Sequence, residues 1–404
     1  MQQPPLKRRA SEIAFSIARS LRSHEAYVKS CIAAGTQSNS PAQFAWRPGL
    51  YGGAAGMSML MRAAEKIDGP EWQPAVHEYL TFAVNAVVNM PMSICEGIPG
   101  ALVALEYAAG TEKRYTRIRA QLAQLAARRL AEQQSKAHAL PQYTSEFDFI
   151  SGTAGSLWGL RAEHGLDSKD LCNRLLWLSE RAERWECVTP TVGSNLGRTI
   201  NLGFSHGVSG PIMALSQCNI GAEHVSALEG IVSWLSERAV SLQDGLQWPT
   251  HTRDGAPILN GRASWCYGTP GIAAALWQAG AFLGRTDVQV LAQESMIALC
   301  RTDPQGWGMK DAALCHGVSG NAAVLHLFAK WTGNAEIQQM ADALFEFLVH
   351  AYDESAPFGY RMYALGGVLV DCAGLLEGAA GIALALLAYS HDETGWMNAL
   401  GMPV

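Results

Sequence analysis

The stretch "GTPGIAAALWQAGAFLG", residues 268–284, places two glycines three residues apart at the start of an uncharged helix pattern. The arrangement recurs along the chain. Its seven copies share a glycine pair separated by two small or turn-prone residues: Gly53/Gly56, Gly97/Gly100, Gly152/Gly155, Gly207/Gly210, Gly268/Gly271, Gly317/Gly320 and Gly378/Gly381. A unit that returns at this kind of interval is typical of repeat proteins.

Each glycine pair is followed by two helix patterns of different character. A short, nearly uncharged pattern such as "GALVALEYAAG" (100–110) comes first. A longer amphipathic pattern such as "AEIQQMADALFEFLVHAY" (335–352) follows. An apolar helix is buried on most of its surface, whereas an amphipathic helix buries one stripe. The alternation therefore predicts two concentric layers of helices.

Counted from the amphipathic stretch at 11–26, the chain holds seven patterns of each kind. We therefore predict an all-α fold, an α/α toroid of seven inner and seven outer helices with some irregular or short β loops. The prediction places residues 1–404 in one domain, with residues 1–10 flexible. The alternative is an ordinary α-solenoid without a site.

The residues directly before the glycine turns argue against a plain solenoid. Most of them are polar or ionisable: Glu96, Ser151, His206, Tyr267, His316 and Glu377, with Gly52 as the exception. Four long loops, 189–207, 242–266, 303–317 and 356–378, lead into the last four turns and have room for short hairpins. Long loops that converge on one face usually shape a site.

Composition limits the class of protein. The net charge of −6 argues against a nucleic-acid partner. The first residues lack the apolar core of a signal peptide, and the longest apolar stretch, "GIALALLAYS" (381–390), is too short to span a bilayer. Nine scattered cysteines in such a chain are expected to be reduced. These features predict a cytoplasmic protein.

Two cysteines occupy equivalent positions in neighbouring repeats. Cys266 and Cys315 each lie two residues before a glycine turn, and His316 follows Cys315 directly. Two thiolates and an imidazole suit Zn²⁺ in a tetrahedral site. Three protein ligands with a vacant fourth position are the arrangement of catalytic zinc. The remaining cysteines are expected to be buried thiols: Cys31, Cys95, Cys172, Cys187, Cys218, Cys300 and Cys372.

The motifs "SWCYGTPG", "LCHGVSG", "FSHGVSG" and "FDFISGTAG" resemble those of the lanthionine synthetase C-like family, whose stand-alone bacterial members are class I lanthipeptide cyclases. The resemblance covers essentially the whole chain, because all seven glycine turns are present. It implies a zinc enzyme on an α/α toroid. Such an enzyme adds cysteine thiols of a precursor peptide to dehydroalanine or dehydrobutyrine, which forms lanthionine and methyllanthionine rings.

The resemblance also implies roles for single residues. Cys266, Cys315 and His316 match the zinc ligands, and His206 matches a candidate acid or base. The other matches are Asp148, which would orient groups at the metal, Arg262, which could stabilise an oxyanion, and Tyr267, which would line the site. Structural roles compete with these functions: helix capping for Asp148, a surface ion pair for Arg262 and packing for Tyr267.

The implied partners are a dehydrated precursor peptide with its leader, a dehydratase and an export transporter. A complex with the last two would bring the protein to the membrane. Three other functions compete with the cyclase. A related enzyme could add glutathione to dehydroamino acids, and a scaffold could hold zinc without catalysis. A toroid glycosidase or prenyltransferase would leave the Cys and His residues unexplained.

Overall fold

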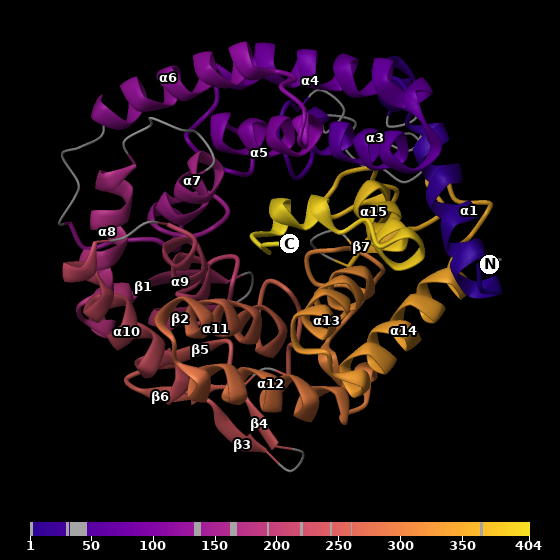
Figure 1. The fold of residues 1–404 in the computed structure, drawn as a ribbon. Coiled ribbons are helices and arrows are strands. Elements are labelled where there is room, and N and C mark those ends of the chain that lie inside the picture. Colours follow the sequence, from indigo (N-terminus) through magenta and orange to yellow (C-terminus); the bar gives the residue numbers. More distant parts are fainter. Residues whose placement is uncertain are drawn as a thin grey trace. The chain divides into compact units, whose positions relative to one another are not determined.

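The computed structural model of the chain describes residues 3–29, 32, 47–132, 139–161, 168–191, 194–218, 221–242, 245–259, 261–363 and 367–404. Helices dominate these residues, and short strands occur in the connecting segments (Figure 1). The chain forms two compact units. The first contains Met1–Pro91, Cys95–Arg119 and Met309–Val404, and the second contains Met92–Ile94 and Ala120–Gly308.

One set of helices begins at the glycine turns and is largely buried. These buried helices are α3 (Ala54–Asp68), α5 (Ile98–Ala109), α7 (Thr153–Leu160), α9 (Ser209–Ser216), α11 (Thr269–Leu283), α13 (Val318–Thr332) and α15 (Ala379–His391). In α7 and α9 every residue is buried. The N-cap is the first glycine of the turn in six of them and Val208, directly after Gly207, in α9. The predicted role of the glycine turns is thereby confirmed.

A second set alternates with the first along the chain. These amphipathic helices are α1 (Pro5–Ser20), α4 (Gln73–Val87), α6 (Thr116–Glu132), α8 (Lys169–Ser179), α10 (Ala222–Ser236), α12 (Thr286–Cys300) and α14 (Ala335–His350). In α14 the buried residues recur with helical spacing, from Ile337 to Leu348, and so line one face. The predicted alternation of two kinds of helix is confirmed.

The bounds of α1 differ from those predicted. The helix begins at Pro5 and ends at Ser20, whereas the sequence pattern predicts a helix over 11–26. Proline is well suited to the first helical position because its missing N–H would have no partner there. Residues 5–10, which the composition assigns to a flexible segment, form the first turns of this helix.

Within each unit the buried helices pack side by side and the amphipathic helices cover them (Figure 1). In the second unit α7, α9 and α11 form the buried row, which α8, α10 and α12 cover. In the first unit the row runs α13, α15, α3, α5, and α14, α1 and α4 cover it. The contact between α1 and α15 joins the first helix of the chain to the last buried one.

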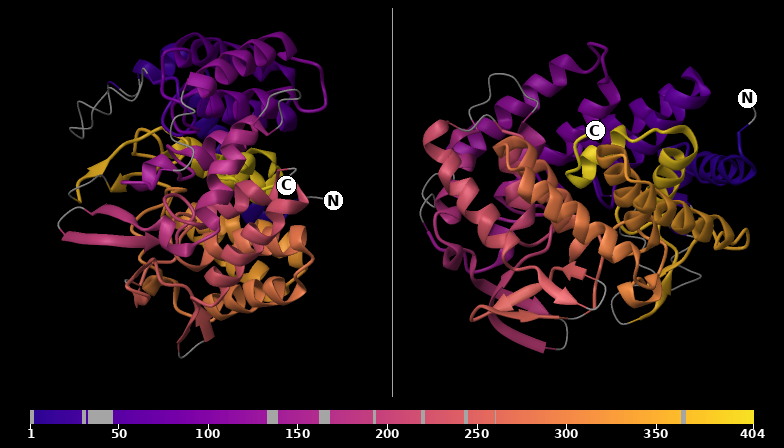
Figure 2. Two further views of the ribbon diagram at one scale, coloured as in Figure 1. Left: turned by 90° about the vertical axis from the view of Figure 1, so that its left-hand side faces the viewer. Right: turned by 60° about the horizontal axis from the view of Figure 1, so that its bottom comes forward.

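Strands occur in three of the four long loops. In the second unit, β1 (Cys187–Thr191), β2 (Ser194–Asn201), β5 (His251–Arg253) and β6 (Ala256–Ile258) form an antiparallel sheet in that order, and β3 (Val240–Leu242) pairs with β4 (Gly245–Gln247). The β1–β2 hairpin projects from this unit (Figure 2). In the first unit β7 (Met362–Tyr363) pairs with β8 (Leu369–Val370).

Several connections are short 3₁₀ helices instead. They are η2 (Pro70–Trp72), η4 (Thr144–Glu146), η5 (Ala182–Trp185), η6 (Pro304–Trp307) and η7 (Gly395–Leu400). The helix η6 lies in the loop 303–317, where the sequence predicts room for a hairpin. Asp303 accepts a hydrogen bond from the Gln305 backbone N–H (3.0 Å), which favours a helical turn there.

Glycine is required at the second position of the turns because neighbouring turns approach closely. A Cβ atom on Gly271 would lie 2.8 Å from the Phe204 Cβ and would also meet the Trp265 carbonyl oxygen. Gly155 and Gly210 are equally crowded by the turn before them. A larger residue does not fit at these positions without moving backbone.

Backbone hydrogen bonds connect successive turns. In the second unit the Phe149 N–H donates to the Ser205 carbonyl (3.1 Å), and the Ser205 N–H donates to the Cys266 carbonyl (3.3 Å). In the first unit the Cys315 N–H donates to the Leu376 carbonyl (3.0 Å). Within each unit these bonds hold neighbouring turns in register. Residues at equivalent positions of neighbouring turns therefore lie next to each other.

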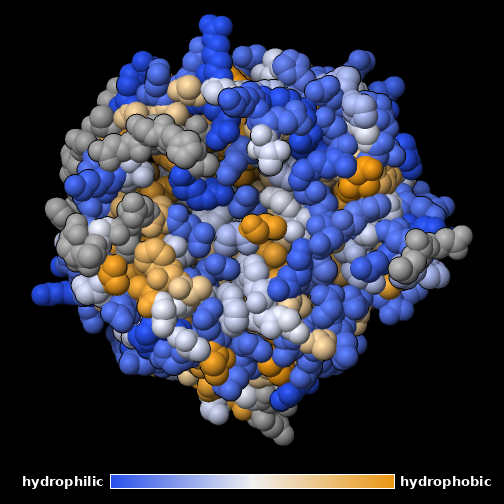
Figure 3. All heavy atoms as spheres, viewed as in Figure 1, coloured by the Kyte–Doolittle hydropathy of each residue, from blue (hydrophilic) through white to orange (hydrophobic). Residues whose placement is uncertain are grey.

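Hydrophobic residues on the face drawn in Figure 3 form separate clusters on a mostly hydrophilic surface. In the described ranges, no helix is both long enough and apolar enough to cross a bilayer.

Candidate functional site

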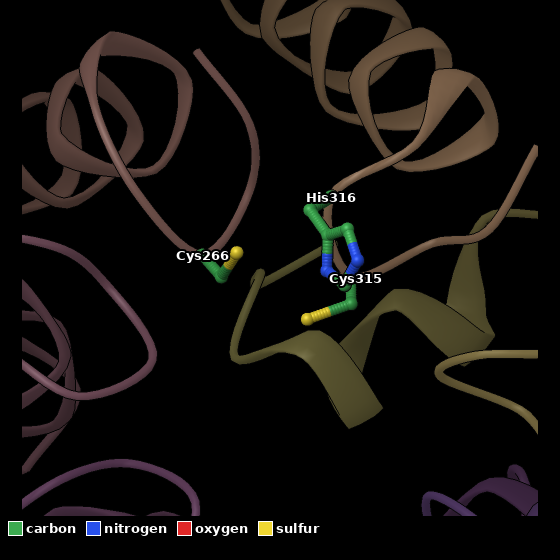
Figure 4. Close-up of side chains that lie close together, drawn as sticks. All are labelled: Cys266, Cys315 and His316. Carbon is green, nitrogen blue, oxygen red and sulfur yellow. The ribbon is translucent and has the colours of Figure 1, made fainter. Parts of the chain in front are cut away.

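Two turns bring the predicted metal ligands together. Cys266 precedes α11 and Cys315 and His316 precede α13. One ligand atom from each of the three residues lies within 4.8 Å of the others (Figure 4). Cys266 is buried, and Cys315 and His316 are half-buried. Zinc–ligand distances of about 2.0 to 2.3 Å place two ligands of one ion less than about 4.6 Å apart, so the three atoms would have to move closer together to share an ion.

A serine that the sequence analysis does not single out supports Cys266. The Ser264 hydroxyl lies 3.3 Å from the Cys266 sulfur, and Ser264 is buried. A hydroxyl at this distance can donate a hydrogen bond to a thiolate, which favours the deprotonated form that binds metals. The only sequence signal for Ser264 is its place two residues before the cysteine.

His206 and Asp148 form a close pair in the second unit. The His206 Nδ1 lies 2.6 Å from the Asp148 Oδ2. The other carboxylate oxygen, Oδ1, accepts hydrogen bonds from the backbone N–H groups of Ser151 (2.7 Å) and Gly152 (2.9 Å). Asp148 is fully buried, so the turn before α7 holds its carboxylate in place. Asp148 therefore both caps this turn and orients the His206 ring.

The pair changes the acidity of His206. Burial of the ring disfavours the imidazolium form, but the hydrogen bond and the charge of Asp148 outweigh it, with a smaller contribution from Cys266. The pKa of His206 is consequently raised above its usual value. With Nδ1 bonded to the carboxylate, Nε2 is the nitrogen that can exchange a proton with another group.

Tyr267 is held by groups on two neighbouring strands. Asn201 on β2 donates from Nδ2 to the Tyr267 hydroxyl (3.4 Å). His251 on β5 is paired in register with Asn201, and its ring lies 5.7 Å from the Tyr267 ring at an angle of 30°. The Arg262 guanidinium lies 5.3 Å from the centre of the same ring. Tyr267 thus connects Arg262 to the four-stranded sheet.

His251 is a buried histidine that the sequence analysis does not predict. Its Nδ1 lies 3.0 Å from the Thr250 hydroxyl, and its buried Nε2 has no hydrogen-bond partner among the residues that the structure describes. Burial lowers the pKa of His251 to about 4. The ring is therefore neutral at physiological pH.

Arg262 does not form the ion pair considered as its alternative role. Across the described ranges, no carboxylate lies within ion-pair distance of its guanidinium, and Arg262 is half-buried. Its nearest aromatic partner is Tyr267. A half-buried guanidinium with this environment can interact with a carbonyl or an oxyanion.

Ser151 takes part in these contacts through its backbone N–H, whereas Glu96 lies elsewhere. Glu96 forms an ion pair with Arg47 (3.0 Å) in the first unit. Of the cysteines expected to be buried, Cys187 and Cys300 are buried, whereas Cys95, Cys172, Cys218 and Cys372 are half-buried. That expectation is wrong for these four, and Cys31 lies outside the described residues.

Buried and amphipathic helices alternate along the chain, which defines a helical-hairpin repeat protein. The turns before two of the buried helices carry the Cys and His side chains of a candidate metal centre. The sequence profile of the lanthionine synthetase C-like proteins matches residues 45–400. The chain belongs to this family.

A solved structure with a similar fold is that of nisin cyclase. The similarity has a TM-score of 0.72 and covers 88% of this chain and 92% of that chain, at 18% sequence identity. It confirms the predicted fold class, because the arrangement of helices agrees even though most residues differ.

Proposed function

We propose that the protein is a zinc-dependent lanthipeptide cyclase that forms lanthionine and methyllanthionine rings in a dehydrated precursor peptide. The observation that carries the proposal is the approach of Cys266, Cys315 and His316 to within 4.8 Å. Membership of the lanthionine synthetase C-like family and the fold shared with a protein named nisin cyclase support the same reaction.

The donor set suits zinc. Two thiolates and one imidazole are ligands that Zn²⁺ prefers, and three protein ligands would leave the fourth position for a substrate thiol. When bound, zinc would lower the pKa of that thiol and so supply a thiolate at neutral pH. Two coordinating cysteine thiolates would balance the charge of the ion and leave the third sulfur electron-rich.

The remaining chemistry requires proton transfers by the protein. The sulfur of a peptide cysteine loses its proton and bonds to the β-carbon of a dehydroalanine or dehydrobutyrine. The electrons of the carbon–carbon double bond move to the α-carbon, which then takes up a proton. His206 can carry such protons on Nε2, with Asp148 holding its ring. Arg262 would stabilise the negative charge on the amide oxygen, and Tyr267 would hold Arg262.

The proposal includes the partners and location that this reaction requires. A dehydrated precursor peptide with its leader would be the substrate, and a dehydratase would have to supply it. Export would follow cyclisation. We therefore propose a cytoplasmic protein that works beside a dehydratase and a transporter at the membrane.

Metal content and cyclisation measured together test the proposal. We expect the wild type to bind one equivalent of zinc and to remove free thiols from a dehydrated peptide, and Cys315→Ala to lose both. Cys95→Ala is a matched control because Cys95 also lies two residues before a glycine turn but is not part of the Cys–Cys–His set. Full zinc content in Cys315→Ala would contradict the ligand assignment.

The substrate separates the cyclase from its alternatives. A peptide with dehydroalanine and its own cysteine should react faster than a cysteine-free dehydroalanine peptide offered with free glutathione. The reverse order would favour the glutathione-adding enzyme. Zinc binding with turnover of neither substrate would favour a scaffold.

A further inference from the structure

A cavity of about 270 Å³ lies in the second unit beside the candidate site. Its lining combines large apolar side chains, Leu242, Trp248, Leu259, Leu299 and Trp307, with polar ones, Gln247, Thr250, Arg262, Thr302 and Asp303. The strands β3 and β4, the segments 248–250 and 261–263, the end of α12 and the 3₁₀ helix η6 contribute to its walls. Cavities lined mainly by apolar groups with a few polar ones are typical of ligand pockets.

Hydrogen bonds within the protein hold the walls of the cavity. The Trp307 indole N–H donates to the Thr302 hydroxyl (2.7 Å), and the Trp248 indole N–H donates to the Leu235 carbonyl (2.9 Å). Both tryptophans are nearly fully buried. Their polar groups are satisfied, so their rings present apolar surface to an occupant. The cavity is therefore preformed, which reduces the entropy cost of binding.

Two apolar side chains of the cavity lining are exposed to water. Leu242 and Leu259 are 41% and 57% exposed. Exposing two large apolar side chains next to an apolar cavity is unfavourable unless a ligand covers them. An occupant that covers these leucines would remove their surface from water together with its own.

Arg262 joins the cavity to the candidate site. It lies on the wall of the cavity, and its guanidinium also lies over the ring of Tyr267, the residue after Cys266. The backbone N–H of the next residue, Ala263, donates to the Trp307 carbonyl (3.0 Å), which ties the segment before Cys266 to η6. A ligand bound in the cavity is therefore close to a cation that has no carboxylate partner among the described residues.

We propose that this cavity is a substrate subsite that takes one large apolar side chain of the peptide, next in sequence to the cysteine or the dehydroamino acid that reacts. In that position Arg262 donates a hydrogen bond to a backbone carbonyl of the same peptide segment. The subsite rests on the proposed function, because it requires a peptide substrate. It determines which cysteines and dehydroamino acids the protein accepts, according to their neighbours.

A variant that fills the cavity tests the subsite. Gly306 lines the cavity, and a Cβ atom there would meet no atom within 4 Å, so Gly306→Phe adds a ring at the cavity wall without displacing backbone. Gly230→Phe is the matched control, because a Cβ on this exposed residue of α10 also meets no atom within 4 Å and Gly230 is not part of the cavity lining.

The substrates are two pairs of dehydrated peptides. The members of each pair differ only in carrying Leu or Ala next to the reacting residue. This Leu or Ala precedes the reacting residue in one pair and follows it in the other. Binding is measured by calorimetry on versions with the cysteine replaced by serine, which cannot cyclise. Burial of the larger side chain should make wild-type binding of one Leu peptide on the order of tenfold to a hundredfold tighter than that of its Ala partner. The preference should vanish in Gly306→Phe and persist in Gly230→Phe.

Different outcomes separate the subsite from the proposed function. Equal binding of Leu and Ala peptides by the wild type in both pairs would overturn the subsite, as would a preference that survives in Gly306→Phe. Neither result bears on zinc content or on cyclisation of the Ala peptides, which test the reaction itself. A Leu preference in binding without any cyclisation would support the subsite and overturn the cyclase.

Discussion

Asp148 holds two different groups with its two carboxylate oxygens. One oxygen accepts two backbone N–H groups of the turn before α7, and the other accepts the Nδ1–H of His206. The sequence leaves open whether Asp148 caps a helix or orients a catalytic group. In the structure Asp148 accepts backbone N–H groups within the turn before α7 and also bonds to His206, since the turn points the second oxygen at the histidine.

Replacement of this carboxylate should change the titration of His206. In Asp148→Asn the hydrogen bonds can remain but the charge is lost, so the pKa of His206 should fall. The pKa of His206 is higher in the folded state than its unfolded value of about 6.5. The pair with Asp148 therefore stabilises the native state fully below about pH 6.5. This stabilisation is lost as the pH rises through the folded pKa of His206. NMR titration of labelled histidine measures the shift.

Asp170→Asn is the control for this titration, because Asp170 is exposed on α8 and is not part of the His206 pair. We expect the pKa of His206 to be unchanged there. An unchanged pKa in Asp148→Asn would show that the charge of Asp148 does not set the acidity of His206.

His251 should make the protein less stable in acid. Its pKa is about 4 in the folded state and about 6.5 when unfolded, so protons bind preferentially to the unfolded chain between these values. Its contribution lowers the free energy of unfolding by about 2 kcal/mol from pH 7 to pH 5. In His251→Phe this part of the loss should disappear, as urea unfolding at the two pH values would show.

The exposed His77 provides the comparison for His251. His77→Phe should retain the full loss of stability between pH 7 and pH 5. If His251→Phe loses as much stability in acid as the wild type, His251 is not buried in its neutral form.

At the scale of elements, the glycine turns determine how closely the buried helices approach. The Phe204 side chain occupies the space that a Cβ on Gly271 would need. The same relation between one turn and the next holds for Gly210 and Phe149. Each buried helix is thus positioned by the turn of its neighbour.

Two glycine-to-alanine variants separate this packing effect from helix propensity. Gly271→Ala forces the added methyl group against backbone and should destabilise the protein by about 1 to 3 kcal/mol. Gly230→Ala, at an exposed position of α10, should stabilise it by up to about 1 kcal/mol because alanine favours helix. Denaturant unfolding of both compares them, and equal effects would mean that the turns tolerate a side chain.

At the scale of the whole molecule, the candidate metal site links segments that are distant in the chain. Cys266 and Cys315 are 49 residues apart, so an ion held by both would constrain a long segment. An ion that binds only the folded state stabilises it in proportion to its affinity. Metal binding should therefore be coupled to global stability.

Removal of the metal tests this coupling. A chelator should lower the midpoint of thermal unfolding of the wild type and of Cys95→Ala. It should have no effect on Cys315→Ala, whose midpoint should already be low. If the chelator lowers the midpoint of Cys315→Ala by the same amount, the ion that it removes is bound elsewhere.

The sequence by itself determined the repeat, the alternation of two kinds of helix and the equivalent positions of Cys266 and Cys315. These properties are local, because the spacing of apolar residues and the places of glycine decide which faces are buried and where helices begin. The candidate metal ligands could be predicted from the positions of these two cysteines relative to the glycine turns.

Only the tertiary structure decided which side chains meet. Cys95 has the same register as Cys266 and Cys315, yet the Cys–Cys–His set does not include it. Asn201 and His251 both contact Tyr267 because β2 and β5 pair. The spacing of residues in the sequence does not predict that pairing. Contacts of this kind depend on long-range packing, since hydrophobic periodicity defines the face of an element but not the neighbour that the face meets.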